Sequence, residues 1–388
     1  MKAAPSYDTL LAEARALVPR LVARAAETER LRRLPEATVA DLAAAGLWAA
    51  YRPARYGGAE IPIRGVVELG ALLGSGCAST SWVFNNLVAH SWMVGYWPEA
   101  AQDEIWSEHP EALIGSGLVM SAGRARAVEG GFRLSGRWPF SSGIDISPWV
   151  LLGGFAENQE PRFYLVRRAE MTIIDTWHVM GLAGTGSKDV AVDDVFVPAY
   201  RSLPATAGRG GPHPGIAVNP GPLFRLPWYP LFSFVTAGTS LGIAQGAVRD
   251  FAAATRDRVA TYSGRTLADL PTLQLRIAEA ATLVDAAEAV LLKDCAEADA
   301  LAAADRVPEM EARARWRRDG AYAARLAARA VDLVFAGSGG GAIHAEHPLQ
   351  RALRDIHAAN GHIGVSWDLN GALFGQVALG LAPEFSLL

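Results

Sequence analysis

The sequence predicts an α+β fold in which a helical domain, a β domain and a helical bundle follow one another along the chain. Apolar residues recur at three- and four-residue steps up to about residue 110, as in amphipathic helices. Alternation with valine and aromatic residues then indicates strands up to residue 198, and helical spacing returns after residue 232. A chain of 388 residues also exceeds the size at which one core keeps growing. We therefore predict domains at 1–112, 113–202 and 231–388, with a separate segment at 203–230.

The first domain is predicted to be helical throughout. Its first helical run starts at Tyr7, and charged residues interrupt its apolar positions, so we expect a folded helix and no signal peptide. Pro53 and the glycines at 57–58 end this first part. A second run opens near Ile63 and another follows Ser79.

The middle domain is predicted to consist of short strands. Residues 126–134 fit a hairpin, because the pair Gly130-Gly131 tolerates the positive φ values of a tight turn. A small β-barrel or sandwich would close this domain. Further strands are predicted at 150–155, 163–166, 171–174 and 190–197.

Proline and glycine are dense between residues 203 and 230, which argues against regular structure there. Long loops in compact proteins are usually functional or disordered. Because Trp228 and Tyr229 lie among the aromatic residues of this segment, we predict a lid that covers a pocket.

The last domain is predicted to be a four-helix bundle. Apolar residues alternate four- and three-residue steps from Leu273 to Leu291, as in a helix packed nearly parallel to its neighbours. A second helix is expected from about 309 to 335, ended by the glycine cluster at 337–341. A third should start near Pro348 and run through His362.

The composition excludes several classes of protein. With 51% hydrophobic residues, 20% charged residues and a net charge of -4, the chain fits a soluble globular protein without the basic excess of a nucleic-acid-binding protein. Cys77 and Cys295 are too few for a disulfide framework or metal cluster, which fits a reducing cytoplasm. The sequence contains no run of about 18 uninterrupted apolar residues, so we expect no membrane span. His344, His347 and His357 are close in sequence, but Pro348 and the scarcity of cysteine argue against a metal.

Two distant segments carry the most specific signal. Residues 136–143 read GRWPFSSG, and residues 337–362 read GSGGGAIHAEHPLQRALRDIHAANGH. Between and around them stand STSW at 79–82 followed by His90, TGSKD at 185–189 leading to VFVP at 195–198, and LQR at 349–351. In their order and spacing, these motifs resemble the flavin-dependent monooxygenases of the acyl-CoA dehydrogenase fold, the oxygenase components of two-component aromatic hydroxylases. The resemblance covers essentially the whole chain.

The resemblance implies an enzyme that takes reduced FMN or FAD from a separate NAD(P)H-dependent flavin reductase. With O2 it would form a C4a-hydroperoxyflavin and hydroxylate an aromatic or polyketide-like molecule. The chain has no nicotinamide-binding signature of its own, which is why a separate reductase is implied. A homotetramer is also implied. Substrate identity, oxidation at sulfur or nitrogen in place of carbon, and the choice between FMN and FAD stay open.

The catalytic residues implied by the resemblance are His362 and Ser142. An imidazole can donate a proton near neutral pH and take it back. A hydroxyl has one donor and two acceptor sites, so Ser142 could hydrogen-bond flavin N5 in either protonation state. Trp138 and Phe140 would supply apolar walls that exclude water.

Further site residues follow from the same resemblance. Arg258, with Tyr262 and Gln274, is expected where the fold reaches a neighbouring subunit's flavin, and His90 is expected to bind a phenolic oxygen. Arg354, with Arg351 and Asp355, fits either a structural ion pair or a flavin contact. The predicted cofactor-binding residues are Trp138, Phe140, Ser141, Ser142, Thr185, Gly186, Ser187, Arg258 and Arg354, and the predicted substrate-binding residues are His90, Trp82, Trp228 and Tyr229.

Structural interpretations stand beside these functional ones. A lone histidine on an apolar helix face is more often a hydrogen-bonded core residue than a catalyst, which applies to His90 and His362. Ser142 fits a turn, and the glycines at 337–341 fit a helix end followed by a tight turn.

Two other functions remain as alternatives. Most acyl-CoA dehydrogenases place a catalytic glutamate where this chain has Ile363, and a base that removes a proton beside a thioester must be a carboxylate. Some dehydrogenases keep that glutamate on another helix, so an FAD-containing acyl-CoA dehydrogenase stays open. A non-catalytic helical scaffold of the same fold is the second alternative.

Overall fold

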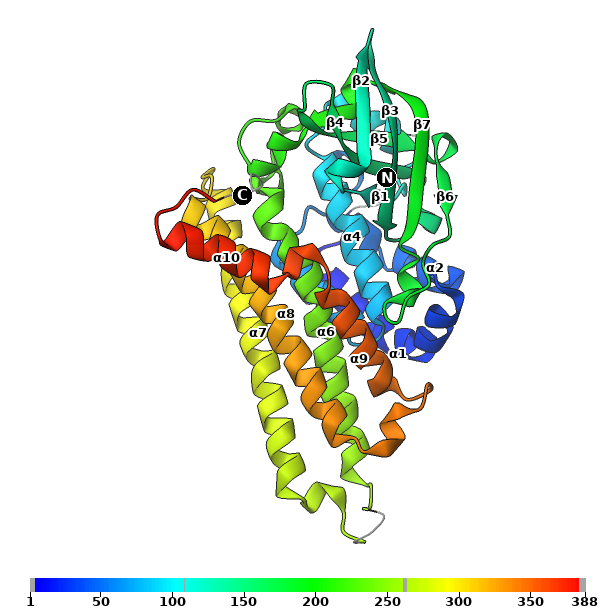
Figure 1. The fold of residues 1–388 in the computed structure, drawn as a ribbon, viewed down its shortest axis with the longest axis vertical. Coiled ribbons are helices and arrows are strands. Elements are labelled where there is room, and N and C mark those ends of the chain that lie inside the picture. The colour runs from blue at the N-terminus through cyan, green and yellow to red at the C-terminus, as the bar shows by residue number, and fades with distance from the viewer. Residues whose placement is uncertain (1–3, 108, 261–263, 384–388) are drawn as a thin grey trace.

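The computed structural model describes residues 4–107, 109–260 and 264–383. A β domain packs against N-terminal helices at one end of the molecule, and a bundle of long helices extends away from them (Figure 1). The described elements follow the order helices, strands and helices along the chain, as the sequence predicted.

Five helices make up the N-terminal part, and the fourth is its centre. Ser6 caps the first helix by accepting a hydrogen bond from the Thr9 backbone N–H. All residues of the fourth helix are buried, so it can present side chains to other domains on every face. The helices are α1 (Tyr7–Leu31), α2 (Glu36–Ala44), α3 (Arg64–Gly74), α4 (Ala78–Val94) and α5 (Glu99–Trp106).

The middle domain is one curved sheet. Its hydrogen-bonded order is β6-β7-β3-β2-β4-β5-β8, with β1 parallel to β4 off this path. The two ends of the path do not pair among the described residues, so the predicted closed barrel is not formed by this ladder. The strands are β1 (Ile114–Gly117), β2 (Gly123–Val128), β3 (Gly131–Ser141), β4 (Trp149–Ala156), β5 (Pro161–Arg167), β6 (Thr172–Ile174), β7 (Lys188–Pro198) and β8 (Ser202–Pro204).

The predicted hairpin is confirmed, and its second strand ends in a bulge. Val128 of β2 pairs with Gly131 of β3 around the turn at Gly130, which has a φ of 78°. Further along, β3 pairs with β7 at Trp138 and next at Ser141, with a register shift between these two residues. A bulge re-aims side chains where it occurs, and here it comes at the end of the GRWPFSSG motif.

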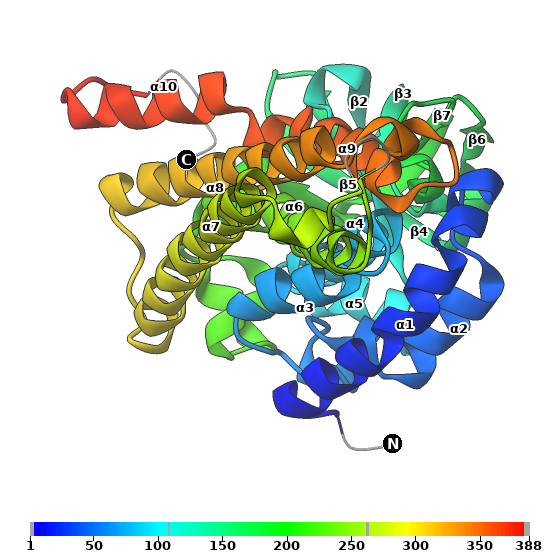
Figure 2. The same ribbon diagram turned by 90° about the horizontal axis from the view of Figure 1, so that it is seen from below.

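Long helices form the described C-terminal part of the chain, and one further helix projects from it. They are α6 (Trp228–Arg256), α7 (Pro271–Ala303), α8 (Met310–Gly337) and α9 (Pro348–Asn360), with α10 (Trp367–Ala378) standing away from the body in Figure 2. The predicted α7 seam is buried except at half-buried Ile277. The expectation that α9 runs through His362 is wrong. The helix ends at Asn360, and His362 caps the short turn at Ile363–Val365.

The α6 helix is apolar because it is a core helix. It is the one described helix long and apolar enough to cross a membrane, but 83% of its most apolar stretch is buried inside the protein. Its small residues fit this position, since a side chain at Gly238 or Gly242 would collide with the α3 backbone.

The segment before α6 is shorter than predicted and is fixed in place. The helix begins at Trp228, so the last residues of the predicted loop are helical. Asn219 donates to the Gly95 carbonyl at 2.8 Å, and Trp92 donates to the Leu223 carbonyl at 2.9 Å. The segment is therefore strapped across the C-terminal end of α4.

Candidate functional site

The Trp82 side chain on α4 joins the two residues predicted to be catalytic. Its indole Nε1–H donates to Ser142 Oγ at 3.0 Å, and its ring meets the His362 ring edge-on with centroids 5.5 Å apart. Ser142 comes from the end of the β domain and His362 from the bundle. The structure thus brings the two predicted catalytic residues into contact with one side chain.

Ser142 begins a chain of buried hydroxyl groups. Its Oγ lies 2.8 Å from Ser187 Oγ, which lies 2.7 Å from Thr185 Oγ1. Thr185 Oγ1 donates to the Leu182 carbonyl at 2.8 Å. The chain connects the GRWPFSSG motif to the TGSKD motif, so the predicted residues Ser142, Thr185 and Ser187 form one hydrogen-bonded unit.

Helix α9 holds the turn that carries this unit. Arg354 contacts the Met180 carbonyl, and Asp355 accepts from the Leu182 N–H at 2.6 Å. Between these two contacts, a side chain at Gly181 would collide with the Arg354 carbonyl. Burial raises the pKa of Asp355 to about 6, although the Leu182 N–H favours its charged form. Arg354 also pairs with Glu29 of α1, so it forms an ion pair, which is the structural alternative given for it above.

His362 has a fixed hydrogen-bonding direction. Its Nδ1 accepts from the Gly364 backbone N–H at 3.0 Å, so in the neutral imidazole the proton lies on Nε2. Burial, with a smaller contribution from the positive charge of Arg317, lowers the pKa of His362 to about 4. At neutral pH the residue is an uncharged hydrogen-bond donor through Nε2–H, and Nε2 has no hydrogen-bond partner among the described residues.

The hydrogen bond at Nδ1 of His90 runs in the opposite direction to that of His362. Its Nδ1 donates to the Ile114 carbonyl at 2.8 Å, so Nε2 carries a lone pair. This Nε2 is buried and has no partner among the described residues. Burial lowers the pKa of His90 to about 4, and its ring stacks on Phe232 of α6 at 6.5 Å. A buried acceptor without a donor is costly, and a ligand hydroxyl would satisfy it.

Apolar side chains are exposed beside the hydroxyl chain. Phe140 is 66% exposed and meets Trp177 edge-on, and Met180 is 62% exposed. Phe140 and Leu182 both have positive φ values, 66° and 53°, which non-glycine residues rarely adopt. Such strain is concentrated at functional sites.

Several predicted residues lie elsewhere. Trp138 is fully buried in the β-domain core and donates to the Gly153 carbonyl at 2.6 Å. Residues two apart on a strand share a face, but the bulge separates Phe140 from Trp138. The place of Trp138 therefore does not support a role as a wall of the flavin site. Ser141 is buried next to Ser142, and its Oγ has no partner among the described residues.

Trp228 and Tyr229 do not lie with His90. Trp228 stacks on Trp97 at 6.1 Å in an aromatic cluster, and Tyr229 donates to the Ala205 carbonyl at 2.9 Å. Both fasten the start of α6 to neighbouring loops. Phe232, one turn further along α6, is the residue that contacts His90.

Arg258 lies at the far end of the bundle. It donates to the Ser338 carbonyl at 2.8 Å and so braces the glycine cluster after α8. Gln274 donates to the Ala268 carbonyl. Tyr262, grouped with them in the sequence analysis, lies outside the described residues.

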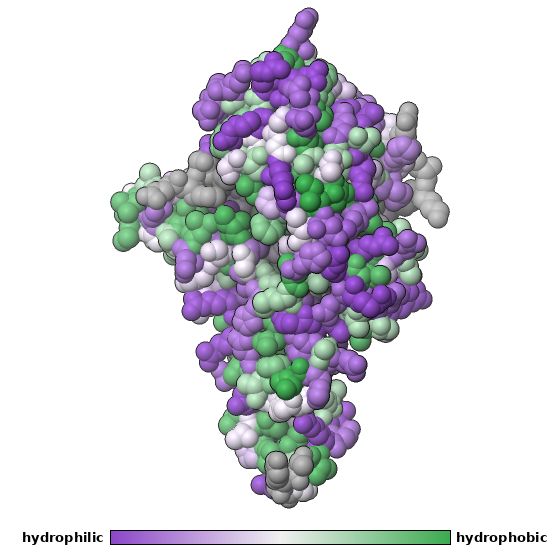
Figure 3. All heavy atoms as spheres, turned by 45° about the vertical axis from the view of Figure 1, so that its right-hand side comes forward, coloured by the Kyte–Doolittle hydropathy of each residue, from purple (hydrophilic) through white to green (hydrophobic). Residues whose placement is uncertain are grey.

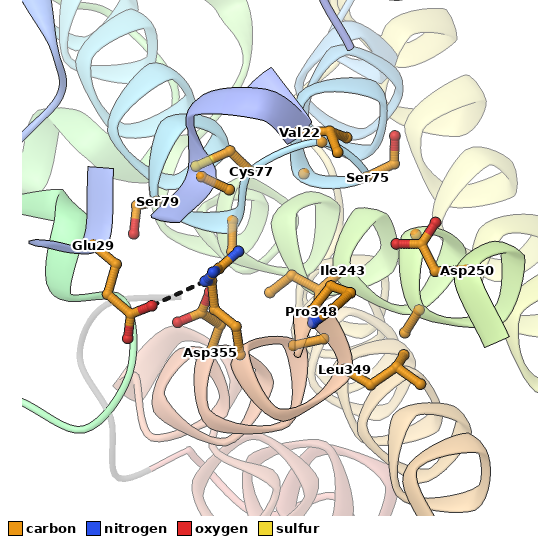
Figure 4. Close-up of a pocket in the computed structure, with 18 of the residues that line it drawn as sticks. Val22, Glu29, Ser75, Cys77, Ser79, Ile243, Asp250, Pro348, Leu349 and Asp355 are labelled. Carbon is orange, nitrogen blue, oxygen red and sulfur yellow. Dashed lines mark hydrogen bonds and ion pairs between the residues drawn. The ribbon is translucent and has the colours of Figure 1, made fainter. Parts of the chain in front are cut away.

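Figure 4 shows a pocket behind the turn that α9 holds. It lies between α1, the start of α4, α6 and α9, and Ser79, Asp355 and the Glu29–Arg351 ion pair line it. Its volume of about 90 Å³ is well below the ~300 Å³ of small-molecule sites. The pocket is too small for a flavin ring and includes neither Ser142 nor His362.

Sequence reasoning missed an ion pair next to the hydroxyl chain. Lys188 donates to Asp145 Oδ1 at 2.8 Å, and Asp145 Oδ2 is buried without a partner among the described residues. A side chain at Gly186, which has a φ of 56°, would contact the Asp145 carboxylate. The TGSKD motif contained Lys188, but nothing local in sequence indicated its partner.

The donor set fits a planar organic cofactor better than a metal. No group of three or more His, Cys, Asp or Glu side chains suited to a metal occurs in the part of the chain that the structure describes. The site offers an oriented serine, an oriented neutral histidine and exposed aromatic surface. These are the contacts that a flavin ring with polar edges and apolar faces requires.

Comparisons with known proteins agree with this chemistry. Residues 234–367 match the family described as acyl-CoA dehydrogenase, C-terminal domain. Over 380 residues the chain is 38% identical to the FADH2-dependent resorcinol hydroxylase, oxygenase component, of a Rhizobium species, and the match covers 93% of this chain and 91% of that protein.

Solved structures are similar over nearly the whole chain. The HsaA monooxygenase from Mycobacterium tuberculosis matches with a TM-score of 0.94 at 33% identity, covering 99% of this chain and 100% of that one. XiaF from a Streptomyces species, solved in complex with FADH2 and glycerol, matches with a TM-score of 0.91 at 29% identity, covering 98% of both chains.

Proposed function

We propose, since this chain belongs to the oxygenase components of flavin-dependent monooxygenases, that it hydroxylates a phenolic aromatic or polyketide-like molecule between Ser142 and His362. One oxygen atom of O2 enters the substrate and the other leaves as water. Reduced FMN or FAD, delivered by a separate NAD(P)H-dependent reductase, supplies the two electrons that activate O2.

The contact that carries this proposal is the Trp82 side chain between the two residues. Its N–H donates to Ser142 and its ring packs on His362, so both residues lie next to the same side chain. Phe140 and Trp177 offer apolar surface beside Ser142 for a flat ring. Thr185, Gly186 and Ser187 supply the adjacent polar atoms, and Arg354 acts by holding their turn.

His362 and Ser142 have separate roles in the proposal. His362 would offer its Nε2–H as a hydrogen-bond donor to oxygen, and its low pKa keeps the imidazole uncharged at neutral pH. Ser142 holds the N5 edge of the flavin. Both residues are buried or half-buried, so their hydrogen bonds compete little with water.

His90 is the proposed recognition group for a phenol. Its buried Nε2 lone pair requires a donor, and the related resorcinol hydroxylase is named for a phenol. Phe232 supplies an aromatic face at the same place. Trp82 lies about two helical turns from His90 on α4, so one helix would contact both cofactor and substrate. The strapped segment at 203–230 is proposed as a fixed wall on this side.

We also propose a cytoplasmic homotetramer. Figure 3 shows hydrophobic side chains at the surface of one face of the molecule. Exposed large apolar side chains of the helical C-terminal part include Leu275 at 70%, Ile343 at 73% and Leu379 at 77%. Such side chains are suited to contact with further copies of the chain. Arg258 and the glycines at 337–341 would then reach a neighbouring subunit's flavin. The two unpaired, buried cysteines fit a reducing compartment.

The test is a reconstituted reaction. The protein, a flavin reductase, NADH and FAD or FMN are mixed with a panel of phenols in air, and hydroxylated product and hydrogen peroxide are measured. We expect product from at least one phenol and none when the oxygenase is omitted.

Two outcomes would contradict the proposal. A tightly FAD-loaded protein that is reduced by an acyl-CoA, with no phenol hydroxylated, would establish the dehydrogenase alternative. A protein that binds neither form of flavin would establish the scaffold alternative.

A further inference from the structure

We infer that Ser187, held by Thr185 and the Leu182 carbonyl, turns the Ser142 hydroxyl so that Ser142 accepts a hydrogen bond from the cofactor and cannot donate one. Ser187 and Thr185 are then positioning residues that give the site a preference for reduced over oxidised flavin. The inference rests on the proposed function and adds the source of the preference.

The direction of the hydroxyl chain follows from its last member. A carbonyl oxygen only accepts, so the 2.8 Å contact between Thr185 Oγ1 and the Leu182 carbonyl uses the single Thr185 proton. Thr185 must then accept from Ser187 at 2.7 Å, which uses the Ser187 proton. Ser187 must in turn accept from Ser142 at 2.8 Å.

The opposite direction would leave two oxygens facing each other without a proton. If Ser187 donated to Ser142, Thr185 would donate to Ser187, and its lone pairs would face the Leu182 carbonyl at 2.8 Å. Thr185, Ser187 and Ser142 are all buried, so water does not relieve that repulsion. The carbonyl therefore sets the direction of all three hydroxyls.

Ser142 keeps one free hydrogen-bonding position after these contacts. Its proton goes to Ser187, and one lone pair accepts from Trp82 Nε1–H at 3.0 Å. The remaining position is a lone pair, which can only accept. The sequence-based expectation that Ser142 serves flavin N5 in either protonation state therefore does not agree with this arrangement.

Flavin N5 differs in the two redox states. Reduced flavin carries a hydrogen on N5 and can donate to the Ser142 lone pair, whereas oxidised flavin has a lone pair on N5 that would face it. An oxygenase that receives reduced flavin and releases oxidised flavin needs this discrimination. Here it comes from residues that need not touch the flavin.

The experiment measures dissociation constants of reduced flavin, under anaerobic conditions, and of oxidised flavin. In Ser187→Ala the Ser142 hydroxyl loses its hydrogen-bond acceptor, so it can donate its proton to N5 of oxidised flavin. We expect oxidised flavin to bind the variant about tenfold more tightly than it binds the parent, equal to about 1.4 kcal/mol. Thr185→Val frees the Ser187 hydroxyl to donate to Ser142 in place of Thr185. This variant should also bind oxidised flavin more tightly than the parent does.

A double-mutant cycle tests whether Ser187 affects flavin binding through Ser142. Ser142→Ala removes the lone pair that would face N5, so it should weaken the binding of reduced flavin and narrow the preference for it, and adding Ser187→Ala to this variant should change neither constant further. Ser147→Ala is the matched control, because Ser147 is a buried serine in the same loop whose hydroxyl donates to the Gly143 carbonyl outside the chain. It should leave the ratio of the two constants at the parent value.

The outcomes separate this inference from the proposed function. Equal or weaker binding of oxidised flavin by Ser187→Ala, in a parent that prefers reduced flavin, would overturn the inference and leave the proposed function standing. A tightening that persists in the Ser142→Ala background would also overturn it. A parent that binds no flavin would refute the proposed function itself. A merely structural role for Ser187 predicts weaker binding of both forms.

Discussion

His90 is buried and His362 is half-buried, and these two histidines have the same charge and opposite hydrogen-bonding directions. Burial lowers the pKa of each to about 4, so both are neutral at pH 7. A backbone N–H occupies Nδ1 of His362 and leaves a donor at Nε2, whereas a backbone carbonyl occupies Nδ1 of His90 and leaves an acceptor. The main chain around a histidine, more than the histidine itself, decides what it can bind.

The largest expected effect tests His362 as the donor. His362→Ala should lower the product formed per NADH consumed by about 100-fold, because removing one preorganised hydrogen-bond donor from developing negative charge typically costs that much or more. Hydrogen peroxide should rise to account for the missing product. His357→Ala is the control, since His357 lies on α9 and pairs only with Asp332 at 2.9 Å among the described residues. If both variants couple oxygen to product as the parent does, His362 has no role in the reaction.

The pH dependence of stability tests the burial of His90. Its folded pKa of about 4 lies below the ordinary value of 6.5, so the unfolded chain takes up a proton first as the pH falls. The stabilisation is fully present above pH 6.5 and is lost between pH 6.5 and 4. Relative to His90→Gln, the parent should lose about 2 kcal/mol in free energy of unfolding between pH 7.5 and 5, measured by urea titration. Parallel pH profiles for the two proteins would show that His90 titrates normally.

A smaller effect separates the acceptor from the donor. His90→Leu should raise KM for a phenolic substrate about tenfold with a lesser change in kcat, because the buried acceptor for the phenol hydroxyl is lost. With the O-methylated analogue, which has no hydroxyl to donate, parent and variant should differ little. An equal loss for both substrates would mean that His90 shapes the pocket without recognising the hydroxyl.

The smallest effect concerns Trp82, which links the two regions. Trp82→Phe keeps a ring against His362 and removes the N–H bound to Ser142. We expect the fraction of NADH coupled to product to fall about threefold, in line with the loss of one neutral hydrogen bond. Trp97→Phe, which removes an N–H bound to the Arg201 carbonyl at 3.1 Å, is the matched control and should leave coupling unchanged. Equal coupling in both variants would mean that the hydrogen bond from Trp82 to Ser142 has no role in the reaction.

The parts of the fold that depend on local pattern were predictable. The α7 seam, the hairpin at Gly130 and the helix that carries Trp82 and His90 each follow from spacing or a turn residue within a few positions. The motifs also pointed to Ser142 and His362, and the structure places each of these two residues in contact with Trp82.

The parts that depend on distant partners were not predictable. The bulge that separates Trp138 from Phe140 needs the β7 partner strand, although Pro139, which cannot donate to the ladder, hinted at it. The end of α9 before His362, and the Asp355 contact to Leu182 across 173 residues, depend on tertiary packing. The direction of the hydroxyl chain depends on one carbonyl, which no side-chain motif encodes.

The most direct test of the shared site is a crystal structure of the protein with reduced flavin under anaerobic conditions. The account predicts that the flavin ring lies against Phe140, with N5 within hydrogen-bonding distance of Ser142 Oγ and His362 on the opposite side. A ring bound elsewhere, or one whose N5 edge faces away from Ser142, would contradict it.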